Sequence, residues 1–218
     1  MGLPLYALMK MEPYLKGSKV LCLGYPDIIA TADHIEKAFG FRPKKFTNQN
    51  ERHRLKEKLP ESFEFFEHMG ATLECVDYHQ TTGDEKIVDL NEPHDLGKFD
   101  LVIDPGTLEH CFNIGQAIIN ASQAVKVGGR ILHLSPMTMM NHGFYNICPT
   151  FYHDFYGQNN WEITTLEPLN ASSMRFEFMS RFLPIMEYML CCMALRRTEA
   201  LMGYPLQSKY IQMHQKVA

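Results

Sequence analysis

The sequence predicts an α/β fold built on a mostly parallel, doubly wound sheet. Short apolar runs alternate with helical patterns along the chain, and these runs end in Gly, Asp, Asn or Pro. The 218 residues are enough for one domain with a sizeable core. We therefore expect a single domain over residues 1–218, with a surface excursion at 41–60 and a helical extension from about residue 184.

Several apolar runs have the length and the endings of parallel strands. The first covers residues 19–23 and ends at Gly24, and the others are ATLECVDY, KIVDLN, FDLVIDPG and RILHLSP. Pro26 and Asp27 stand where a helix would begin, which predicts a strand, a tight turn and a helix that continues to Gly40. Asn113 has the position of a cap for the helix that precedes the last of these strands.

Beyond residue 160 the sequence predicts two strands and then a helix. The segments WEITTLEPL and SSMRFEFMSRF are typical of an antiparallel pair. The run PIMEYMLCCMALRRTE is rich in Met and Cys, which indicates a buried helix. A terminal helix this apolar could also pack against a second copy of the chain, so a homo-oligomer formed through it stays open.

The composition favours a small-molecule partner. The net charge of -4 gives the chain no overall positive field, so we expect no nucleic-acid partner. The basic residues of 42–58 are either a solvated face or a phosphate-binding patch. No apolar run reaches the roughly 18 residues of a spanning helix, which predicts no membrane association and a cytoplasmic protein. The 6 cysteines include no CxxC pair, so we interpret them as buried, reduced thiols.

Aspartates close three of the predicted strands. Asp77, Asp89 and Asp104 each follow an apolar run. Sheets of this kind bind ligands outside the carboxyl ends of their strands, so the three carboxylates are expected at one edge. One such aspartate could merely cap the next helix, but three in succession favour a ligand that carries hydroxyls and positive charge.

Five segments resemble the motifs of the class I S-adenosylmethionine-dependent methyltransferases over roughly residues 17–165. These are VLCLG, LECVDY, VDLN, FDLVIDPGTLEHCFN and AVKVGGRILHLSP. The resemblance implies a Rossmann-like, seven-stranded sheet with an antiparallel C-terminal hairpin, and S-adenosylmethionine as the cofactor. The cofactor residues that it implies are Gly24, Tyr25, Asp27, Asp77, Tyr78, Asp89, Leu90, Asp104, Pro105 and Gly106.

The resemblance also implies which part of the cofactor each residue meets. Asp77 would bind the ribose hydroxyls, because a carboxylate accepts two hydrogen bonds from a diol. Val88, Leu90 and Cys75 would wall the adenine slot, with Asp89 or Asn91 near the exocyclic amine. Asp104 and Gly106 would lie nearer the methionyl end.

The first motif departs from the family pattern. It reads Gly24-Tyr25-Pro26-Asp27, with one glycine where the family usually has two or three. Tyr25 and Pro26 remove the close backbone approach that glycine allows. Two interpretations follow: a divergent pocket in which Tyr25 packs against the methionyl part, and a non-catalytic module that binds a nucleotide or a partner chain.

The predicted catalytic residues are His142, Tyr145, Glu109 and His110. Methyl transfer is an in-line displacement, so the protein positions the acceptor and takes its proton where that is needed. His142 lies in the polar NHGFYN loop and suits proton removal, with Tyr145 to orient the acceptor. Glu109 and His110 could equally be helix-start residues. The expected acceptor is a small molecule such as a sugar or sugar conjugate, methylated on oxygen or nitrogen. A metal held by Asp104, Glu109, His110 and His142 has no diagnostic spacing, so none is predicted.

Overall fold

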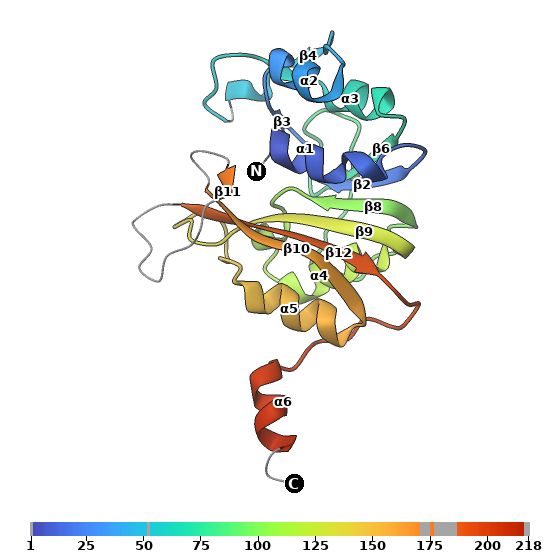
Figure 1. Ribbon diagram of the computed structural model, residues 1–218, viewed down its shortest axis with the longest axis vertical. Helices are drawn as coiled ribbons and strands as arrows, with labels where there is room; N and C mark the ends of the chain where they lie inside the picture. The colour runs from blue at the N-terminus through green and yellow to red at the C-terminus, as the bar shows by residue number, and fades with distance from the viewer. Residues whose placement is uncertain (1, 52, 171–174, 177–186, 216–218) are drawn as a thin grey trace.

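A twisted mixed sheet forms the centre of the computed structural model, which describes residues 2–51, 53–170, 175–176 and 187–215 (Figure 1). The sheet is 8-stranded, in the order β11-β10-β12-β9-β8-β2-β6-β7. Pairing is parallel from β7 to β9 and antiparallel from β9 to β11. The predicted mixed, Rossmann-like architecture is confirmed, and the two-residue β11 is an addition at one edge. The strands are β2 (Lys19–Leu23), β6 (Thr72–Asp77), β7 (Lys86–Ile87), β8 (Phe99–Asp104), β9 (Val125–Pro136), β10 (Trp161–Asn170), β11 (Arg175–Phe176) and β12 (Tyr188–Arg196).

Helices cover both faces of this sheet. In strand β2, Val20 and Cys22 point into one core cluster, while Leu21 and Leu23 point into the other, because successive residues of a strand face opposite sides. The first face is covered by α1 (Leu5–Met11), η1 (Glu12–Tyr14), α2 (Ala32–Phe39) and α3 (Ser62–His68), and the second by η3 (Leu108–His110), α4 (Ile114–Gln123) and α5 (Pro149–Gln158).

The segment after β2 differs from the predicted tight turn and helix. Ile28 and Ile29 form strand β3, which pairs in parallel with β1 (Leu3–Pro4). Helix α2 begins only at Ala32, where the Thr31 side chain accepts a hydrogen bond from the backbone N–H of His34. The helix ends at Gly40, whose φ of 66° gives the left-handed C-cap. Residues 24–31 therefore form a turn and the short strand β3 before the helix begins.

The Met- and Cys-rich segment is a strand, so the helix predicted there is wrong. β12 lies between β9 and β10, and all nine of its residues are buried. Side chains on both faces of such a strand are apolar, and the period-2 pattern of a half-exposed strand is lost. The homo-oligomer that the sequence left open therefore has no helix through which to form. The predicted strand SSMRFEFMSRF lies largely outside the described residues, apart from β11.

The third predicted strand is shorter than KIVDLN. Only Lys86 and Ile87 pair with β6, as strand β7. Residues 78–85 and 88–98 contain no helix, so this edge of the sheet consists of two loops around a short strand. Val88 to Asn91 leave the sheet and turn toward its carboxyl edge, where they become available to line a site.

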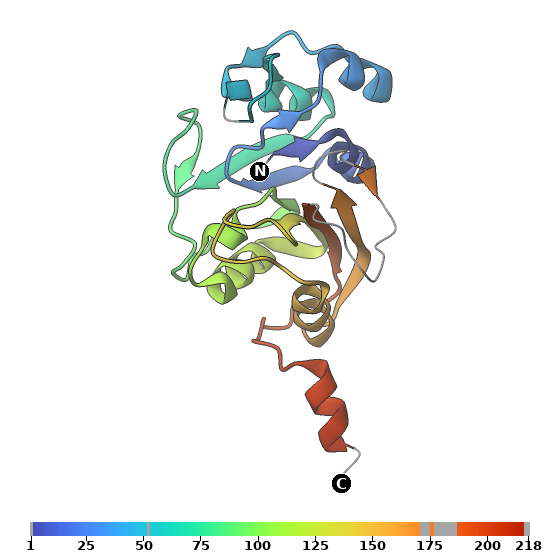
Figure 2. The same ribbon diagram turned by 90° about the vertical axis from the view of Figure 1, so that its left-hand side faces the viewer.

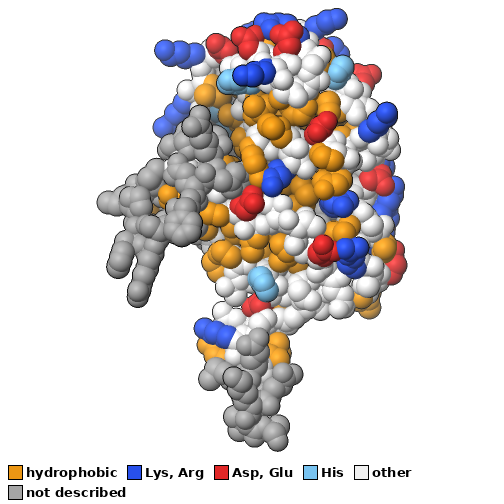
Figure 3. Space-filling view, in the orientation of Figure 1, with side chains coloured by type: hydrophobic (Ala, Val, Ile, Leu, Met, Phe, Trp, Pro, Cys, Tyr) orange, Lys and Arg blue, Asp and Glu red, His pale blue; other side chains and the backbone are white. Residues whose placement is uncertain are grey.

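Residues 41–60 form an excursion between α2 and α3 in the chain. They contain β4 (Phe46–Thr47), η2 (Gln49–Glu51) and β5 (Leu59–Pro60). Arg42 pairs with Asp33 and Glu36, at 2.8 and 2.5 Å. Figure 3 shows acidic and basic side chains intermixed over this end of the molecule. This mixture supports the interpretation of the 42–58 stretch as a solvated face.

The last described segment stands away from the sheet. Helix α6 (Ser208–Gln215) projects beyond α5 in both views (Figures 1 and 2). Side chains of α5 and of its C-cap residue hold this segment: the Ser208 hydroxyl donates to Asp154 at 2.5 Å, and the Asn159 side chain bonds both the N–H and the C=O of Gly203. None of the helices in the described ranges is long and apolar enough to cross a bilayer.

Candidate functional site

A pocket of about 360 Å³ opens at the carboxyl ends of β2, β6 and β8. This is the edge at which doubly wound sheets bind their ligands. The residues that line the pocket come from the loops after those strands and from the segment after β7: Leu23, Gly24, Tyr25, Asp77, Tyr78, His79, Val88, Asp89, Leu90, Asn91, Pro105, Gly106, Thr107, His110 and Cys111. Eight of the ten predicted cofactor residues line the pocket, all except Asp27 and Asp104, while Thr107, His79 and Cys111 were not predicted.

Gly24 keeps the centre of the pocket open. Its φ is 82°, a conformation that favours glycine. A Cβ at this position would lie 3.4 Å from the Thr107 hydroxyl oxygen and 3.5 Å from Asp77 Oδ2. The Thr107 hydroxyl in turn donates to the Leu23 carbonyl at 2.6 Å. The left-handed φ therefore favours the single glycine of the divergent first motif, whose backbone lies between these two polar groups.

Asp77 has one carboxylate oxygen engaged and one directed at this opening. Oδ1 accepts a hydrogen bond of 2.6 Å from the backbone N–H of Tyr78, and Oδ2 is the atom that faces Gly24. The residue is half-buried. A carboxylate fixed in this way can accept hydrogen bonds from a diol without first losing other partners.

An apolar slot with polar edges lies beside Asp77. Val88 and Leu90 contribute its apolar wall, and Cys75, which was expected there, is buried in the opposite core cluster. Asp89 accepts hydrogen bonds from the backbone N–H and side-chain amide of Asn91, and these bonds lower the pKa of the Asp89 carboxyl. Burial raises the pKa of the Cys111 thiol to about 12, so this pocket-lining group is neutral.

Tyr25 lines the pocket and also belongs to the core. It is 6% exposed, and its hydroxyl donates to Glu61 at 3.0 Å and accepts from the backbone N–H of Ser62 at 3.1 Å. Burial raises the pKa of the Tyr25 hydroxyl, and the neighbouring Glu61 adds to the shift. The ring is therefore anchored to the start of α3, and a residue in this role cannot be exchanged without a structural cost.

Asp27 and Asp104 do not line the pocket, in contrast to the prediction. Asp27 is buried beneath the excursion, with Oδ2 2.7 Å from His53 Nε2. Asp104 is fully buried: Oδ1 accepts from the N–H groups of Thr107 and Leu108, and Oδ2 lies 2.8 Å from His133 Nδ1. Asp104 thereby holds the turn through Pro105 and Gly106, whose residues do line the pocket.

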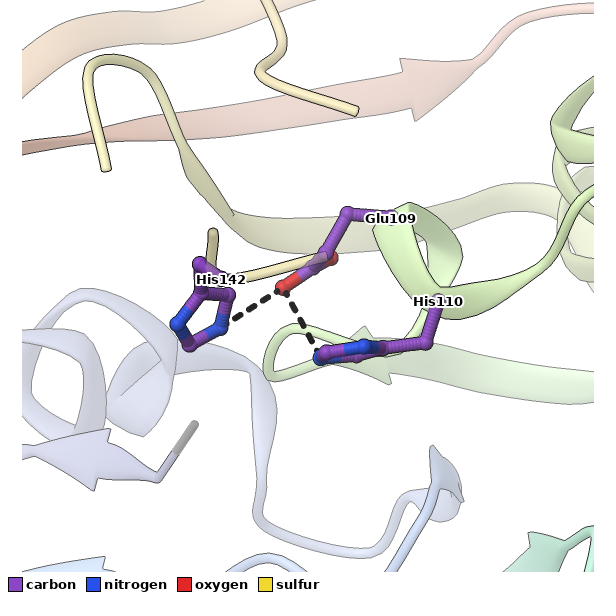
Figure 4. Close-up of side chains that lie close together, drawn as sticks. All are labelled: Glu109, His110 and His142. Carbon is purple, nitrogen blue, oxygen red and sulfur yellow. Dashed lines mark ion pairs between the residues drawn. The ribbon is translucent and has the colours of Figure 1, made fainter. Parts of the chain in front are cut away.

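Three predicted catalytic residues meet at one end of the pocket. Figure 4 shows the imidazoles of His110 and His142 on either side of the Glu109 carboxylate. Glu109 Oε1 lies 3.5 Å from His142 Nε2 and 3.9 Å from His110 Nε2. Glu109 is fully buried, and the side chains of His110 and His142 are 49% and 25% exposed. His110 also lines the pocket, so the group that we call the Glu109 cluster (Glu109, His110 and His142) borders it directly.

The loop that carries His142 is fixed to η3. The Phe144 N–H donates to the Glu109 carbonyl at 2.8 Å. A Cβ at Gly143 would lie 2.8 Å from the same carbonyl oxygen, so this close approach requires glycine. Burial lowers the pKa of the His110 imidazole; Glu109 opposes that shift and His142 adds to it.

Tyr145 lies outside the pocket lining, and its hydroxyl bonds a neighbouring loop. Its hydroxyl donates to the Phe112 carbonyl at 2.7 Å. Phe112 and Phe144 meet edge to face, with ring centroids 5.4 Å apart, and both rings are largely exposed. Tyr145 thus joins the loop after β9 to the end of η3, and two apolar rings remain exposed beside the Glu109 cluster.

Comparison with solved structures identifies the fold. The sequence itself matches no family model and no curated protein. The structure is similar to TehB from Haemophilus influenzae, with a TM-score of 0.54, 10% identity and 87% of this chain covered; the chain spans 61% of the length of TehB. It is also similar to the 1,6-didemethyltoxoflavin-N1-methyltransferase of Burkholderia thailandensis, solved with 1,6-didemethyltoxoflavin and S-adenosylhomocysteine. The TM-score there is 0.51 and the identity 12%, with 88% of this chain and 79% of the other covered. The chain therefore has the fold of the class I S-adenosylmethionine-dependent methyltransferases.

Proposed function

We propose that this protein binds S-adenosylmethionine in the pocket at the sheet edge and transfers its methyl group to a small molecule. The observation that carries the proposal is the open position at Gly24, which lies directly opposite the free oxygen of Asp77. A fold likeness at low identity does not fix an activity, so the proposal depends on the chemistry of these side chains.

Each part of the cofactor has a matching surface in the pocket. The ribose diol suits Asp77 Oδ2, and the adenine ring suits the slot beside Val88 and Leu90. Asn91 stands at the polar edge of that slot. The methionyl part would then pass Gly24 and Gly106, which brings the sulfonium methyl toward the Glu109 cluster at the other end of the lining.

The acceptor would enter beside the Glu109 cluster. Either imidazole there could take a proton from a hydroxyl or amine as the methyl group moves. The exposed rings of Phe112 and Phe144 suit an acceptor with an apolar body. Neither the pocket residues nor the fold comparisons support the sugar that was expected from the sequence.

The alternative of a non-catalytic module derives from Tyr25 and Pro26, which replace glycines of the usual first motif. Because the Tyr25 hydroxyl is bonded to Glu61 and Ser62, the side chain is held at the pocket wall and the opening at Gly24 persists. This arrangement favours a ligand-binding pocket over an occluded one.

Calorimetry separates these functions. We expect S-adenosylhomocysteine and S-adenosylmethionine to bind with micromolar affinity at one site per chain. Transfer of a labelled methyl group to members of a panel of aromatic hydroxyl and amine compounds would then establish the enzyme. The absence of any binding heat and of any shift in melting temperature at millimolar ligand would refute cofactor binding. Binding without transfer to any acceptor would favour the module.

A further inference from the structure

The Glu109 carboxylate is buried without a hydrogen-bond partner. Neither of its oxygens accepts a hydrogen bond from any residue in the described ranges, and His142 Nε2 is likewise unsatisfied. A buried carboxylate without donors is costly, because the group has lost its water and gained nothing in return. The Nε2 atoms of His142 and His110, at 3.5 and 3.9 Å from Glu109 Oε1, are too far away for good hydrogen bonds.

The geometry points to a divalent cation bound by Glu109, His110 and His142. One ligand atom from each residue lies within 4.8 Å of the other two. Ligands about 2.0–2.2 Å from one zinc-sized ion are separated by roughly 3.0–3.5 Å, so small movements of the two imidazoles bring all three onto one ion. The side chains of His110 and His142 are partly exposed, which leaves room for that movement. Such an ion would also give the buried Glu109 carboxylate the partner that it lacks.

The donor set narrows the class of ion. Two imidazoles and one carboxylate suit borderline cations such as Zn²⁺, Mn²⁺ or Fe²⁺, whereas Mg²⁺ and Ca²⁺ prefer oxygen ligands. Three protein ligands leave at least one coordination position open, as in catalytic zinc sites. Because His110 lines the pocket, a molecule in that open position would lie beside the place proposed for the acceptor.

If the protein transfers a methyl group as proposed, the cation would select an acceptor that presents an oxygen atom. Only this choice of acceptor rests on the proposed function; cation binding itself does not. A hydroxyl on the cation loses its proton to water at a lower pH than in solution. This replaces proton removal by the imidazoles of His110 and His142, because their ring-nitrogen lone pairs then hold the cation. Its oxygen then forms a bond to the methyl carbon as the bond from that carbon to sulfur breaks. The electron pair of the broken bond stays on sulfur, which leaves S-adenosylhomocysteine and the O-methylated acceptor.

The test uses the full chain without a histidine tag, freed of metal with a chelator and then dialysed. We expect Zn²⁺ to bind at one site per chain by calorimetry, and Co²⁺ to give visible absorption bands of a low-coordinate site. Glu109→Gln and His110→Ala should each weaken Zn²⁺ binding by more than about tenfold. The matched control is His34→Ala, because His34 is exposed on α2, far along the chain from the cluster.

The outcomes are distinct. Zn²⁺ binding that is absent, or that is unchanged in Glu109→Gln and His110→Ala proteins with wild-type melting curves, would overturn the site. His110→Ala keeps the test valid if the buried Glu109 variant fails to fold, since His110 is half-exposed. S-adenosylhomocysteine titration of the same samples separates the two proposals. Cofactor binding without Zn²⁺ binding rejects the cation alone, and Zn²⁺ binding without cofactor binding rejects the methyltransferase function alone.

Discussion

Asp77 is the residue on which cofactor recognition should depend most. The Asp77→Asn substitution removes the charge that faces the proposed ribose while keeping the shape of the side chain. We expect S-adenosylhomocysteine binding to weaken by about 1–3 kcal/mol, the usual loss for a hydrogen bond to a charged group. Calorimetry measures this, with Asp84→Asn as the control because Asp84 is exposed in the next loop and outside the pocket lining. Equal affinity in both variants would exclude Asp77 from the site.

Substitution of Tyr25 should reveal what its hydroxyl and its buried ring each contribute to stability. Tyr25→Phe leaves the Ser62 N–H and the Glu61 carboxylate without the tyrosine hydroxyl, and we expect a loss of about 1 kcal/mol in the free energy of unfolding. Tyr25→Gly empties a buried site, which typically costs about 3–5 kcal/mol for a large aromatic side chain. Urea unfolding measures both. A Tyr25→Gly protein as stable as the wild type would show that the ring is not part of the core.

Sequence reasoning succeeded at residues whose role depends on where a strand ends. Asp77, Asp89 and Gly24 were predicted because each directly follows an apolar run, and the ends of parallel strands meet at one edge. Asp104 also ends a strand and Asp27 lies in the turn after β2, yet they bond His133 and His53, which lie more than 20 residues away in the sequence. No local sequence pattern indicates such distant partners. Whether those carboxylates face the pocket or a histidine therefore could not be predicted.

At the scale of elements, β12 is the strand whose integrity holds the antiparallel part of the sheet together. Leu190 is buried in the second core cluster, and Leu190→Ala should lower the free energy of unfolding by about 2–5 kcal/mol. The control is Leu201→Ala, since Leu201 is 91% exposed. Urea unfolding of the two variants gives the comparison. Equal free energies of unfolding for the Leu190→Ala protein and the wild type would show that this side chain is not part of the core.

The elements that sequence reasoning placed correctly carry strong local signals. β2 has an apolar run ended by glycine, and α4 has a capping Asn113 whose side chain accepts from the Gln116 N–H. β7 and β12 lack such signals. β7 pairs through only two residues, and the order of pairing that buries β12 on both sides is a property of the whole sheet.

At the scale of the whole molecule, the chain after residue 200 is joined to the domain through polar contacts with α5. Asn159→Ala removes both bonds to Gly203. We expect faster hydrogen exchange in residues 200–208 and unchanged S-adenosylhomocysteine affinity, because Asn159 does not line the pocket. Exchange measured by mass spectrometry reports the first effect. Unaltered exchange there would mean that other contacts hold the segment.

The overall plan of the molecule was the most predictable feature, because one domain with alternating strands and helices has few ways to bury its apolar faces. The cluster of Glu109, His110 and His142 was only partly predictable. The adjacent pair came from its position after β8, but its meeting with His142 depends on Gly143 approaching the Glu109 backbone. That contact joins two loops and has no signature in either.

The position of β12 between β9 and β10 has a consequence for the newly made chain on the ribosome. β9 and β10 are not neighbours in the folded sheet, and the strand that lies between them is synthesised after both. Translation at about 5–20 residues per second leaves their backbone edges open for a few seconds before β12 emerges. During that interval the nascent chain offers two unpaired edges to any neighbouring strand, so we expect its yield in cells to depend on chaperones that cover such edges.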